Sequence, residues 1–319
     1  MDKNREQLRE LLAREDFSEI FERADTLRRE QVGDTIRVRA LLEFSNYCRR
    51  SCRYCGLNCR NPKLERFRLE PAEIVETALA AREAGYRTIV LQSGEDPYYT
   101  PEILGEMVRK IKPSGIAVTL SCGEFSREEY RYFRECGADR YLLKHETSDP
   151  NLYAGLHPDS TLEQRVQCQR YIKEAGLETG GGFMIGLPGQ TLDTIAGDLL
   201  LLREIGCDMA GIGPFLPHPD TPLRDAAHGS AQLTMRAVAL ARLLLPRANL
   251  PATTALGVLD AKEKRSVFSC GANVIMQKVT PQRMKNLYQI YPASFEEVDI
   301  PEGRKRVEQE IVSLGRIPE

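Results

Sequence analysis

The stretch FSNYCRRSCRYCGLNC, residues 44–59, places four cysteines in one short segment, at Cys48, Cys52, Cys55 and Cys59. It directly follows IRVRALLEF, residues 36–44, whose apolar and β-branched side chains predict a buried strand. The cysteines are therefore expected in the loop that leaves this strand. The N-terminal run MDKNREQLRELLARED is too highly charged for a secretory signal, so the cysteines indicate a metal site rather than disulfides.

A repeating pattern of β-rich runs and amphipathic helical stretches continues from this strand. Helical stretches such as TLEQRVQCQRYIKEAG begin at a threonine cap and end at a glycine. Strands that alternate with helices predict a parallel sheet. Eight strands in about 260 residues favour a TIM-type (βα)8 barrel, an α/β fold, over an open doubly wound sheet. The predicted strands are residues 36–44, 88–95, 116–124, 139–147, 179–186, 208–216, 250–256 and 272–277.

Three parts of the chain are expected. Residues 1–34 predict an N-terminal helical extension, because leucine, isoleucine and phenylalanine recur there at helical spacing among charges. Residues 35–292 predict the barrel, and no Pro/Gly/Ser-rich linker interrupts them. Residues 293–319 predict a short C-terminal tail with one helix, RKRVEQEIVSLG.

The overall composition excludes several classes of protein. The net charge is −2 and 42% of the residues are hydrophobic, which gives no electrostatic case for nucleic acid or an anionic membrane. The sequence contains no apolar run of about 18 residues, so it predicts no membrane span. We expect a cytoplasmic protein with a substantial core. The isolated cysteines are expected to be buried packing residues, although Cys122 follows the third predicted strand; they are Cys122, Cys136, Cys168, Cys207 and Cys270.

Three kinds of metal site fit four clustered cysteines. Structural zinc prefers two pairs of ligands on separate segments, whereas here all four lie on one loop with no histidine nearby. A closed ferredoxin-type cluster uses C-x2-C-x2-C and a remote Cys-Pro, whereas the first gap here is three residues and Arg60 follows Cys59. The third possibility is C-x3-C-x2-C, in which Cys48, Cys52 and Cys55 leave one iron of a four-iron cluster open for chemistry.

The C-x3-C-x2-C spacing, with an aromatic residue before the third cysteine, resembles the radical S-adenosylmethionine (SAM) superfamily. The resemblance implies a 4Fe-4S cluster on Cys48, Cys52 and Cys55 and SAM bound at the open iron. SGED at 93–96 resembles the element that receives the SAM ammonium, and GGFMIGLPGQT at 181–191 resembles the element that packs on adenine. Arg165 suits the SAM carboxylate, because a guanidinium can donate two parallel hydrogen bonds in the plane of a carboxylate. The implied SAM-binding residues are Tyr54, Gly94, Glu95, Glu146 for the ribose, Arg165 for the carboxylate, Met184 and Pro214.

Longer sequence segments within residues 35–292 resemble one family of this superfamily, the HydE family of iron–iron hydrogenase maturases. They include RALLEFSNYCRRSCRYCGL, GIGPFLPHPDTPL, CGANVIM and LYQIYP. The resemblance implies a small iron unit with carbonyl, cyanide and cysteine ligands as substrate, and a 5′-deoxyadenosyl radical that adds to sulfur. It implies other hydrogenase maturases and a low-potential electron donor as partners. The implied catalytic residues are Met209, Met276, Tyr288 and Tyr291, and the implied substrate-binding residues are Arg39, Thr119, Thr253 and Thr254.

Other functions stay open at this point. Methylornithine synthase and biotin synthase resemble the chain in fold and in several phrases, and imply hydrogen abstraction from carbon. A redox carrier would hold its cluster whether or not SAM is present. A non-catalytic scaffold would bind iron units without cleaving SAM.

Overall fold

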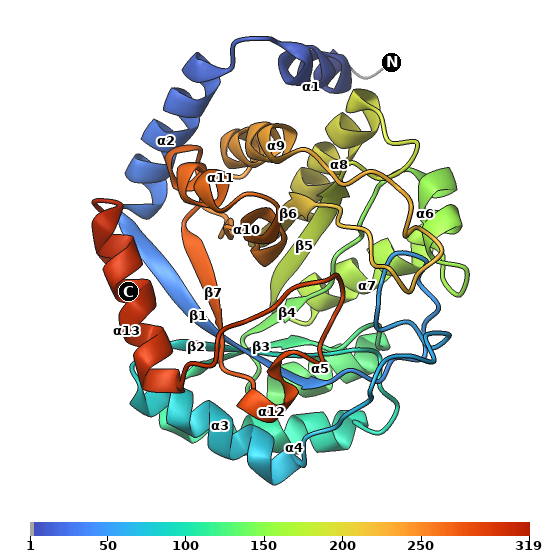
Figure 1. Ribbon diagram of the computed structural model, residues 1–319, viewed down its shortest axis with the longest axis vertical. Coiled ribbons are helices and arrows are strands. Elements are labelled where there is room, and N and C mark those ends of the chain that lie inside the picture. The colour runs from blue at the N-terminus through green and yellow to red at the C-terminus, as the bar shows by residue number, and fades with distance from the viewer. Residues whose placement is uncertain (1–2) are drawn as a thin grey trace.

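The computed structural model describes residues 3–319. Within them, seven strands form one parallel sheet in the order β6-β5-β4-β3-β2-β1-β7, and helices lie around its outer face (Figure 1). The strands are β1 (Thr35–Ser45), β2 (Thr88–Ser93), β3 (Ala117–Ser121), β4 (Arg140–Leu142), β5 (Glu178–Ile185), β6 (Met209–Pro214) and β7 (Val274–Lys278). The prediction of a parallel α/β sheet that starts near residue 36 is confirmed.

The helices mostly occupy the stretches between strands, as predicted. The connecting helices are α3 (Pro71–Glu83), α4 (Pro101–Ile111), α5 (Arg127–Glu135), α6 (Pro150–Leu156), α7 (Leu162–Glu174), α8 (Leu192–Ile205) and α9 (Ala231–Leu244). Shorter ones follow: α10 (Thr254–Leu259), α11 (Ala261–Ser266) and α12 (Gln282–Lys285), with single 3-10 turns η1 (Lys112–Ser114) and η2 (Val267–Ser269). The start of α5 is capped: Ser126 accepts from the backbone N–H of Glu129, and the Glu129 carboxylate accepts from the Ser126 N–H.

The prediction of a regular strand at 250–256 is wrong. This segment makes only isolated parallel bridges, Met209 with Asn249 and Pro251 with Val274. Pro251 has no N–H to donate to a ladder, and the Thr253 side chain caps α10 instead. The sheet is therefore a curled part-barrel of seven strands, and the two bridges span its opening between β6 and β7.

The fourth strand is much shorter than the predicted 139–147. β4 ends at Leu142, and the chain then turns through Glu146, the one non-glycine residue with a positive φ, 65°, in the described part of the chain. The remaining predicted strands are observed with small shifts of their ends. Beyond the short β4, the chain still hydrogen-bonds to β5 at Leu143, His145 and Glu146, and it brings Glu146 to the end of the sheet.

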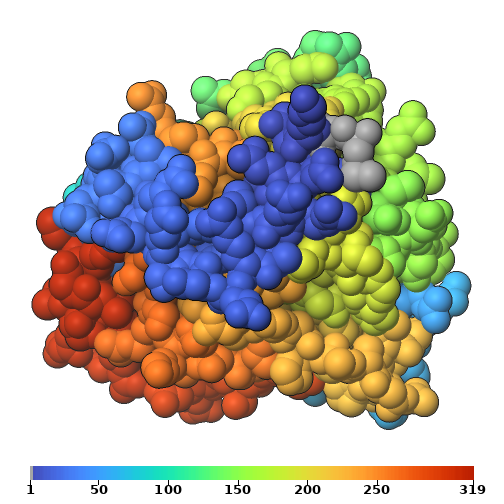
Figure 2. Space-filling model, turned by 90° about the horizontal axis from the view of Figure 1, so that it is seen from above, coloured from blue at the N-terminus to red at the C-terminus, as the bar shows by residue number. Residues whose placement is uncertain are grey.

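Both ends of the described chain pack on the part-barrel. The predicted helical run at the N-terminus is two helices, α1 (Lys3–Ala13) and α2 (Ser18–Val32), which pack on α8 and α9 (Figure 2). The tail contains α13 (Ile300–Ser313), as predicted, and β8 (Ile317–Pro318), which pairs with β1. Side chains of α1, α2 and α13 belong to the same hydrophobic cluster as the strands, while the domain limits at residues 34 and 292 stay a prediction. No described helix is both long and apolar enough to cross a membrane.

Candidate SAM and cluster site

The loop after β1 carries the four clustered cysteines and is fixed by hydrogen bonds to its own backbone. The Arg66 guanidinium donates to the carbonyl oxygens of Asn46 at 2.6 Å, Leu57 at 2.8 Å and Asn58 at 2.6 Å. The Asn58 side chain donates to the carbonyl of Cys55 at 2.7 Å. Buried backbone groups in this loop thus have partners without regular structure, and the loop holds one shape.

Three of these cysteines differ from the fourth in environment. Cys48, Cys52 and Cys55 are half-buried, whereas Cys59 is exposed. Burial and the neighbouring Cys48 thiol raise the pKa of Cys52 to about 12, and burial with the thiols of Cys52 and Cys48 raises the pKa of Cys55. The three sulfurs are thus near enough to oppose one another's ionisation, which bound iron would reverse.

The donor set fits a four-iron cluster better than one metal ion. Among residues 3–319, no three His, Cys, Asp or Glu side chains are grouped so as to hold a single metal ion. Each thiolate of a four-iron cluster binds a different iron, so its three ligands surround a volume instead of converging on one point. Three half-buried thiols on one fixed loop suit that geometry.

A chain of alternating charges joins the cysteine loop to the ends of β2 and β3. The Glu95 carboxylate lies 3.2 Å from Arg49 and 2.6 Å from Arg50. Arg50 also contacts Glu124 at 2.8 Å, and Glu124 contacts Arg165 at 2.6 Å. Glu95 and Arg165 were predicted from the resemblance, whereas Arg50 and Glu124 were not assigned a role. They are 74 residues apart in sequence, so only the fold brings them together.

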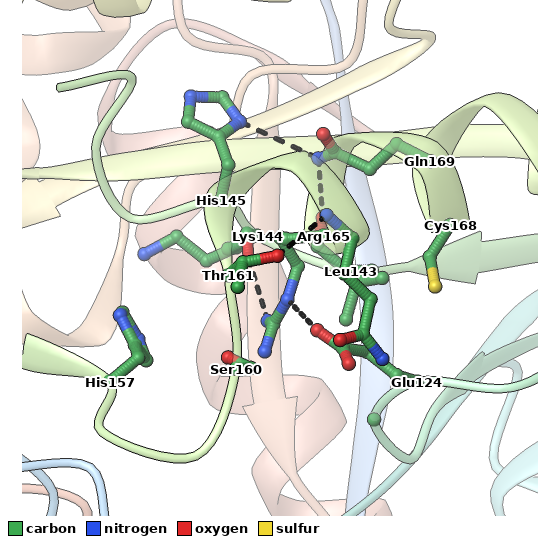
Figure 3. Close-up of polar contacts among 12 residues, drawn as sticks. Glu124, Leu143, Lys144, His145, His157, Ser160, Thr161, Arg165, Cys168 and Gln169 are labelled. Carbon is green, nitrogen blue, oxygen red and sulfur yellow. Dashed lines mark hydrogen bonds and ion pairs between the residues drawn. The ribbon is translucent and has the colours of Figure 1, made fainter. Parts of the chain in front are cut away.

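Arg165 lies on α7 and is held at two of its guanidinium nitrogens (Figure 3). Its Nε donates to Glu124 at 2.6 Å and one terminal nitrogen, Nη1, donates to the carbonyl of Lys144 at 2.9 Å. The other terminal nitrogen, Nη2, makes no hydrogen bond to any described residue. A fixed guanidinium with a free nitrogen suits an incoming carboxylate.

Gly123 determines where the Glu95 side chain lies. A Cβ atom on Gly123 would be 1.8 Å from Cγ of Glu95, and the Gly123 φ of +93° is unfavourable for other residues. Gly123→Ala should displace Glu95 and lower SAM affinity by about tenfold or more, with a backbone strain of about 1–3 kcal/mol. Isothermal titration of SAM into the cluster-loaded variant measures this.

Gly115→Ala is the matched control for the Gly123 variant. Gly115 has a φ of +80° but no atom within 4 Å of an added Cβ. It should therefore show the backbone strain without the loss of SAM affinity. Equal affinities in the two variants would contradict the role given to Gly123.

Glu146 is held in its left-handed conformation by the neighbouring strand β5. Its backbone N–H donates to the carbonyl of Gly182 at 3.1 Å, and its carbonyl accepts from the N–H of Met184 at 3.0 Å. The carboxylate lies 3.0 Å from the Lys144 ammonium. These contacts offset the strain of a non-glycine residue at positive φ and point Glu146 to the same cavity as Met184.

Asp198, which no sequence pattern indicated, lies next to this turn. Its buried carboxylate accepts from the N–H of Ser148, and from the Gln190 amide at 3.4 Å. Gln190 in turn donates to the carbonyl of Met184 at 2.8 Å. One side chain on α8 thus ties the loop after β4, which carries Glu146, to Gln190 in the loop after β5, and through Gln190 to Met184 near the end of β5.

Asp198 also predicts a dependence of stability on pH. Burial is the main cause that raises the pKa of Asp198 from 3.8 to about 7, against the hydrogen bonds of its donors. The folded state therefore binds the proton more tightly, and this contribution to stability, full below about pH 4, is lost as the pH rises through about 7. Asp198→Asn should remove it. Urea unfolding of both proteins across this window measures the difference between their unfolding free energies.

Asp193→Asn is the control, because Asp193 lies on the same helix but is only partly buried, in an ion pair with Arg5. It should shift the unfolding free energy little at any pH in this window. A constant offset between the Asp198 variant and the unchanged protein, from about pH 4 to 7, would contradict the burial argument.

A cavity of about 220 Å³ opens at the carboxyl ends of the strands, where active sites of βα barrels lie. Of the predicted site residues, it is lined by Tyr54, Glu146, Met184, Pro214, Thr253, Thr254, Met276, Tyr288 and Tyr291. The structure thus brings together nine residues from seven separate segments of the chain. Tyr54 is held there by a 3.2 Å hydrogen bond between its hydroxyl and Nε2 of His157.

A smaller cavity of about 30 Å³ lies deeper, and contains the other predicted substrate residues, Arg39 and Thr119, with Met209. The two cavities share Met276 as a lining residue. One terminal nitrogen of Arg39 lies 2.7 Å from the Met209 sulfur. Neither Nε of Arg39 nor Oγ1 of Thr119 has a hydrogen-bond partner among residues 3–319. Burial lowers the pKa of Arg39 to about 9. Unpaired buried donors of this kind suit an anionic or lone-pair ligand.

Two lining groups of the larger cavity were missed by sequence reasoning. Glu43 and Lys278 form a buried ion pair at 2.9 Å, and burial raises the pKa of Glu43 to about 7. Gln92 donates to the Tyr288 hydroxyl at 3.2 Å, which orients that ring. Glu43 and Lys278 lie on the neighbouring strands β1 and β7, where Lys278 stands opposite Leu41, and strand pairing over such a distance in sequence leaves no local signal.

Two predicted assignments concern residues away from the cavities. Gly94 approaches the backbone of Tyr47 so closely that an added Cβ would lie 2.2 Å from its carbonyl oxygen. Cys122 is buried, with its sulfur 3.8 Å from the carbonyl of Leu91, and lines neither cavity. Gly94 therefore has a steric reason to be glycine, and Cys122 packs as the other isolated cysteines do.

Comparison with known proteins agrees with this geometry. Residues 42–202 match the model of the Radical SAM superfamily. The chain is 52% identical to the [FeFe] hydrogenase maturase subunit HydE of Thermotoga maritima over 90% of this chain and 84% of that one. It is 30% identical to 3-methylornithine synthase of Methanosarcina acetivorans over 83% of this chain and 75% of that one.

Solved structures show the same fold. Methylornithine synthase (PylB) superimposes with a TM-score of 0.87 at 27% identity, over 99% of this chain and 94% of that one. HydG, a maturase of the [FeFe]-hydrogenase, gives a TM-score of 0.82 at 21% identity, over 100% of this chain and 76% of that one. The cysteine loop, the strand-end residues and the extended identity lead to one conclusion: the chain belongs to the radical SAM superfamily and, within it, to the HydE family of hydrogenase maturases.

Proposed function

We propose that this chain cleaves SAM and uses the resulting radical on a sulfur-bearing iron precursor during assembly of the iron–iron hydrogenase active site. The observation that carries the proposal is the 52% identity to HydE over 90% of the chain. The two cavities support it, because they hold soft and hydroxyl side chains with two unpaired buried donors. The substrate is proposed as a small iron unit with cysteine attached.

The residues at the cluster loop suit a 4Fe-4S cluster and SAM. Cys48, Cys52 and Cys55 would hold three irons, and the fourth would be left for the SAM amino and carboxylate groups. When bound, the cluster supplies one electron to the SAM sulfonium, whose C–S bond breaks to give methionine and a 5′-deoxyadenosyl radical. Glu95 would accept from the SAM ammonium, and Arg165 would donate to its carboxylate.

The remaining cofactor residues would position the nucleoside. Glu146, fixed at positive φ, would accept from the ribose hydroxyls, while Met184 and Pro214 would pack on adenine. Tyr54, held by His157, closes the side of the cavity next to Cys55. These contacts would place C5′ toward the deeper cavity, where near-attack positioning lowers the barrier.

Neither buried histidine near the cavities is placed for acid–base catalysis, and Glu43, whose pKa burial raises to about 7, is held in an ion pair with Lys278. Burial lowers the pKa of His145 and of His157 to about 3, so both are neutral and neither suits a general base. Met209, Met276, Tyr288 and Tyr291 would exclude water from the radical. Arg39, Thr119, Thr253 and Thr254 would orient the substrate's carboxylate or cyanide groups.

Anaerobic turnover with a deuterated thioether substrate tests the reaction type. We expect a product that joins deoxyadenosine to sulfur and little deuterium in free 5′-deoxyadenosine. Efficient transfer of deuterium into 5′-deoxyadenosine would instead mean abstraction of hydrogen from carbon. The methylornithine-synthase or biotin-synthase type of reaction, which the PylB superposition favours, would then replace this proposal.

A further inference from the structure

The loop that carries the cysteines differs in charge from the rest of the protein. Residues 46–70 contain seven lysines and arginines and two glutamates, in a chain whose net charge is −2. The remainder of the chain is therefore acidic. Four of these basic residues pair with carboxylates elsewhere in the chain, namely Arg49, Arg50, Lys63 and Arg68. The positive field that can attract an acidic partner therefore comes from the others, above all Arg53 and Arg60.

A surface groove of about 610 Å³ runs along this loop. Its basic lining residues are Arg53, Arg60, Lys63 and Arg224, and Asp220 is its one acidic lining residue. Asp220 pairs with Lys63 at 2.7 Å. Neither Arg53 nor Arg60 has a carboxylate within ion-pair distance among residues 3–319, and both are exposed. The groove thus offers two exposed arginines that make no ion pair with a described residue, with the charge of Asp159 close enough to interact with Arg60.

The groove lies directly beside the proposed cluster ligands. Ser51 and Arg53, the two neighbours of Cys52 in the chain, both line it. Its walls are rigid: the Arg53 N–H donates to the carbonyl of Leu156 at 2.9 Å, and Asp159 accepts from the Ser51 N–H and hydroxyl at 2.6 and 2.7 Å. Prolines at 62, 158, 219 and 222 complete the walls. Little order has to be gained when a partner binds there.

We propose that this groove docks an acidic protein that carries a single low-potential electron to the cluster. The inference rests on the proposed function, which consumes one electron for each SAM cleaved. That electron has to come from a separate reductant. In the docked complex the donor is oxidised by one electron and the cluster is reduced by one. The unpaired charges of Arg53 and Arg60 steer the donor, and the groove's position beside Cys52 brings its redox group close to the cluster.

The test replaces Arg53 and Arg60 together by glutamate and compares two reductants. An acidic flavodoxin, reduced to its hydroquinone, serves as the protein donor, and dithionite serves as the small reductant. We expect the flavodoxin-driven rate of SAM cleavage to fall about tenfold or more at low salt, and the dithionite-driven rate to stay unchanged. Binding of oxidised flavodoxin to the cluster-loaded protein should weaken in parallel, and added salt should reduce the difference.

Arg23→Glu with Lys305→Glu is the matched control, because it makes the same change in net charge. These exposed residues lie on α2 and α13, at the left of Figure 1, whereas the cysteine loop lies at the right. The control should retain the flavodoxin-driven rate. An equal loss in the control, or an unchanged flavodoxin rate in the groove variant, overturns the docking site.

The outcome separates this inference from the function on which it rests. If the unchanged protein fails to cleave SAM with dithionite, the proposed function itself fails. If the glutamate variant loses its cluster, Arg53→Gln with Arg60→Gln takes its place under the same criterion, since neutral side chains perturb the loop less.

Discussion

Cys48→Ala, Cys52→Ala and Cys55→Ala should each abolish the cluster, whereas Cys59→Ser should retain about four irons per chain. The reason is that three half-buried thiols share one fixed loop, while Cys59 points to solvent. Loss of any one ligand leaves an iron exposed to water and the remaining thiols with unfavourable ionisation. Iron and sulfide analysis after anaerobic reconstitution, together with the cluster's absorption, measures this.

SAM cleavage should follow the iron content of these four variants. The three alanine variants should show none, and Cys59→Ser should match the unchanged protein. Far-UV circular dichroism separates loss of ligand from loss of fold. A variant at Cys59 that fails to hold iron would show that the ligands have been wrongly assigned.

Arg165→Ala should weaken SAM binding by about 1.5–3 kcal/mol, or about 10- to 150-fold in Kd, the range for a charge-assisted hydrogen bond. Arg165 offers its free Nη2 because Glu124 and the Lys144 carbonyl fix the other two nitrogens. Equilibrium dialysis of SAM against the cluster-loaded variant measures the change. Arg170→Ala, on the exposed side of the same helix in a pair with Glu204, should bind SAM normally.

Arg165→Ala also affects the stability of the fold, and this effect has to be separated from the loss of SAM affinity. Removing one partner of a buried ion pair costs about 3–5 kcal/mol, although Glu124 keeps its contact with Arg50. Arg165→Lys retains the charge but not the fork of donors, so it should restore stability more than SAM affinity. Normal affinity in both Arg165 variants would show that the SAM carboxylate binds elsewhere.

Local patterns in the sequence predicted the fold well where one residue type decides the structure. The strand before the cysteines, the threonine-capped helices and the cysteine spacing are signals contained within a few residues. The strand at 250–256 failed because its apolar residues fit either a strand or a helix start, and Pro251 and Thr253 decided for bridges and a cap. The short β4 failed because the turn at Glu146 depends on hydrogen bonds from β5.

The site was predictable only in part for the same physical reason. Strand-end residues such as Glu95 and Glu146 could be placed because parallel strands end at one edge. The partners of those residues could not, because Arg50 meets Glu124, and Asp198 meets the loop after β4, only through tertiary packing. The cavity residues Met209 and Tyr288 depended on the family resemblance, since either would also suit a plain core.

The pairing of β1 with β7 has a consequence for synthesis of the protein. Lys278 ends β7 more than 230 residues after β1 ends at Ser45. At about 5–20 residues per second, one edge of the strand that carries the cysteine loop stays unpaired for roughly 10–50 s on the ribosome. An open strand edge is a site for aggregation, so the nascent chain should depend on chaperone holding during that interval. Iron would bind to a completed cysteine loop only after β7 has been synthesised.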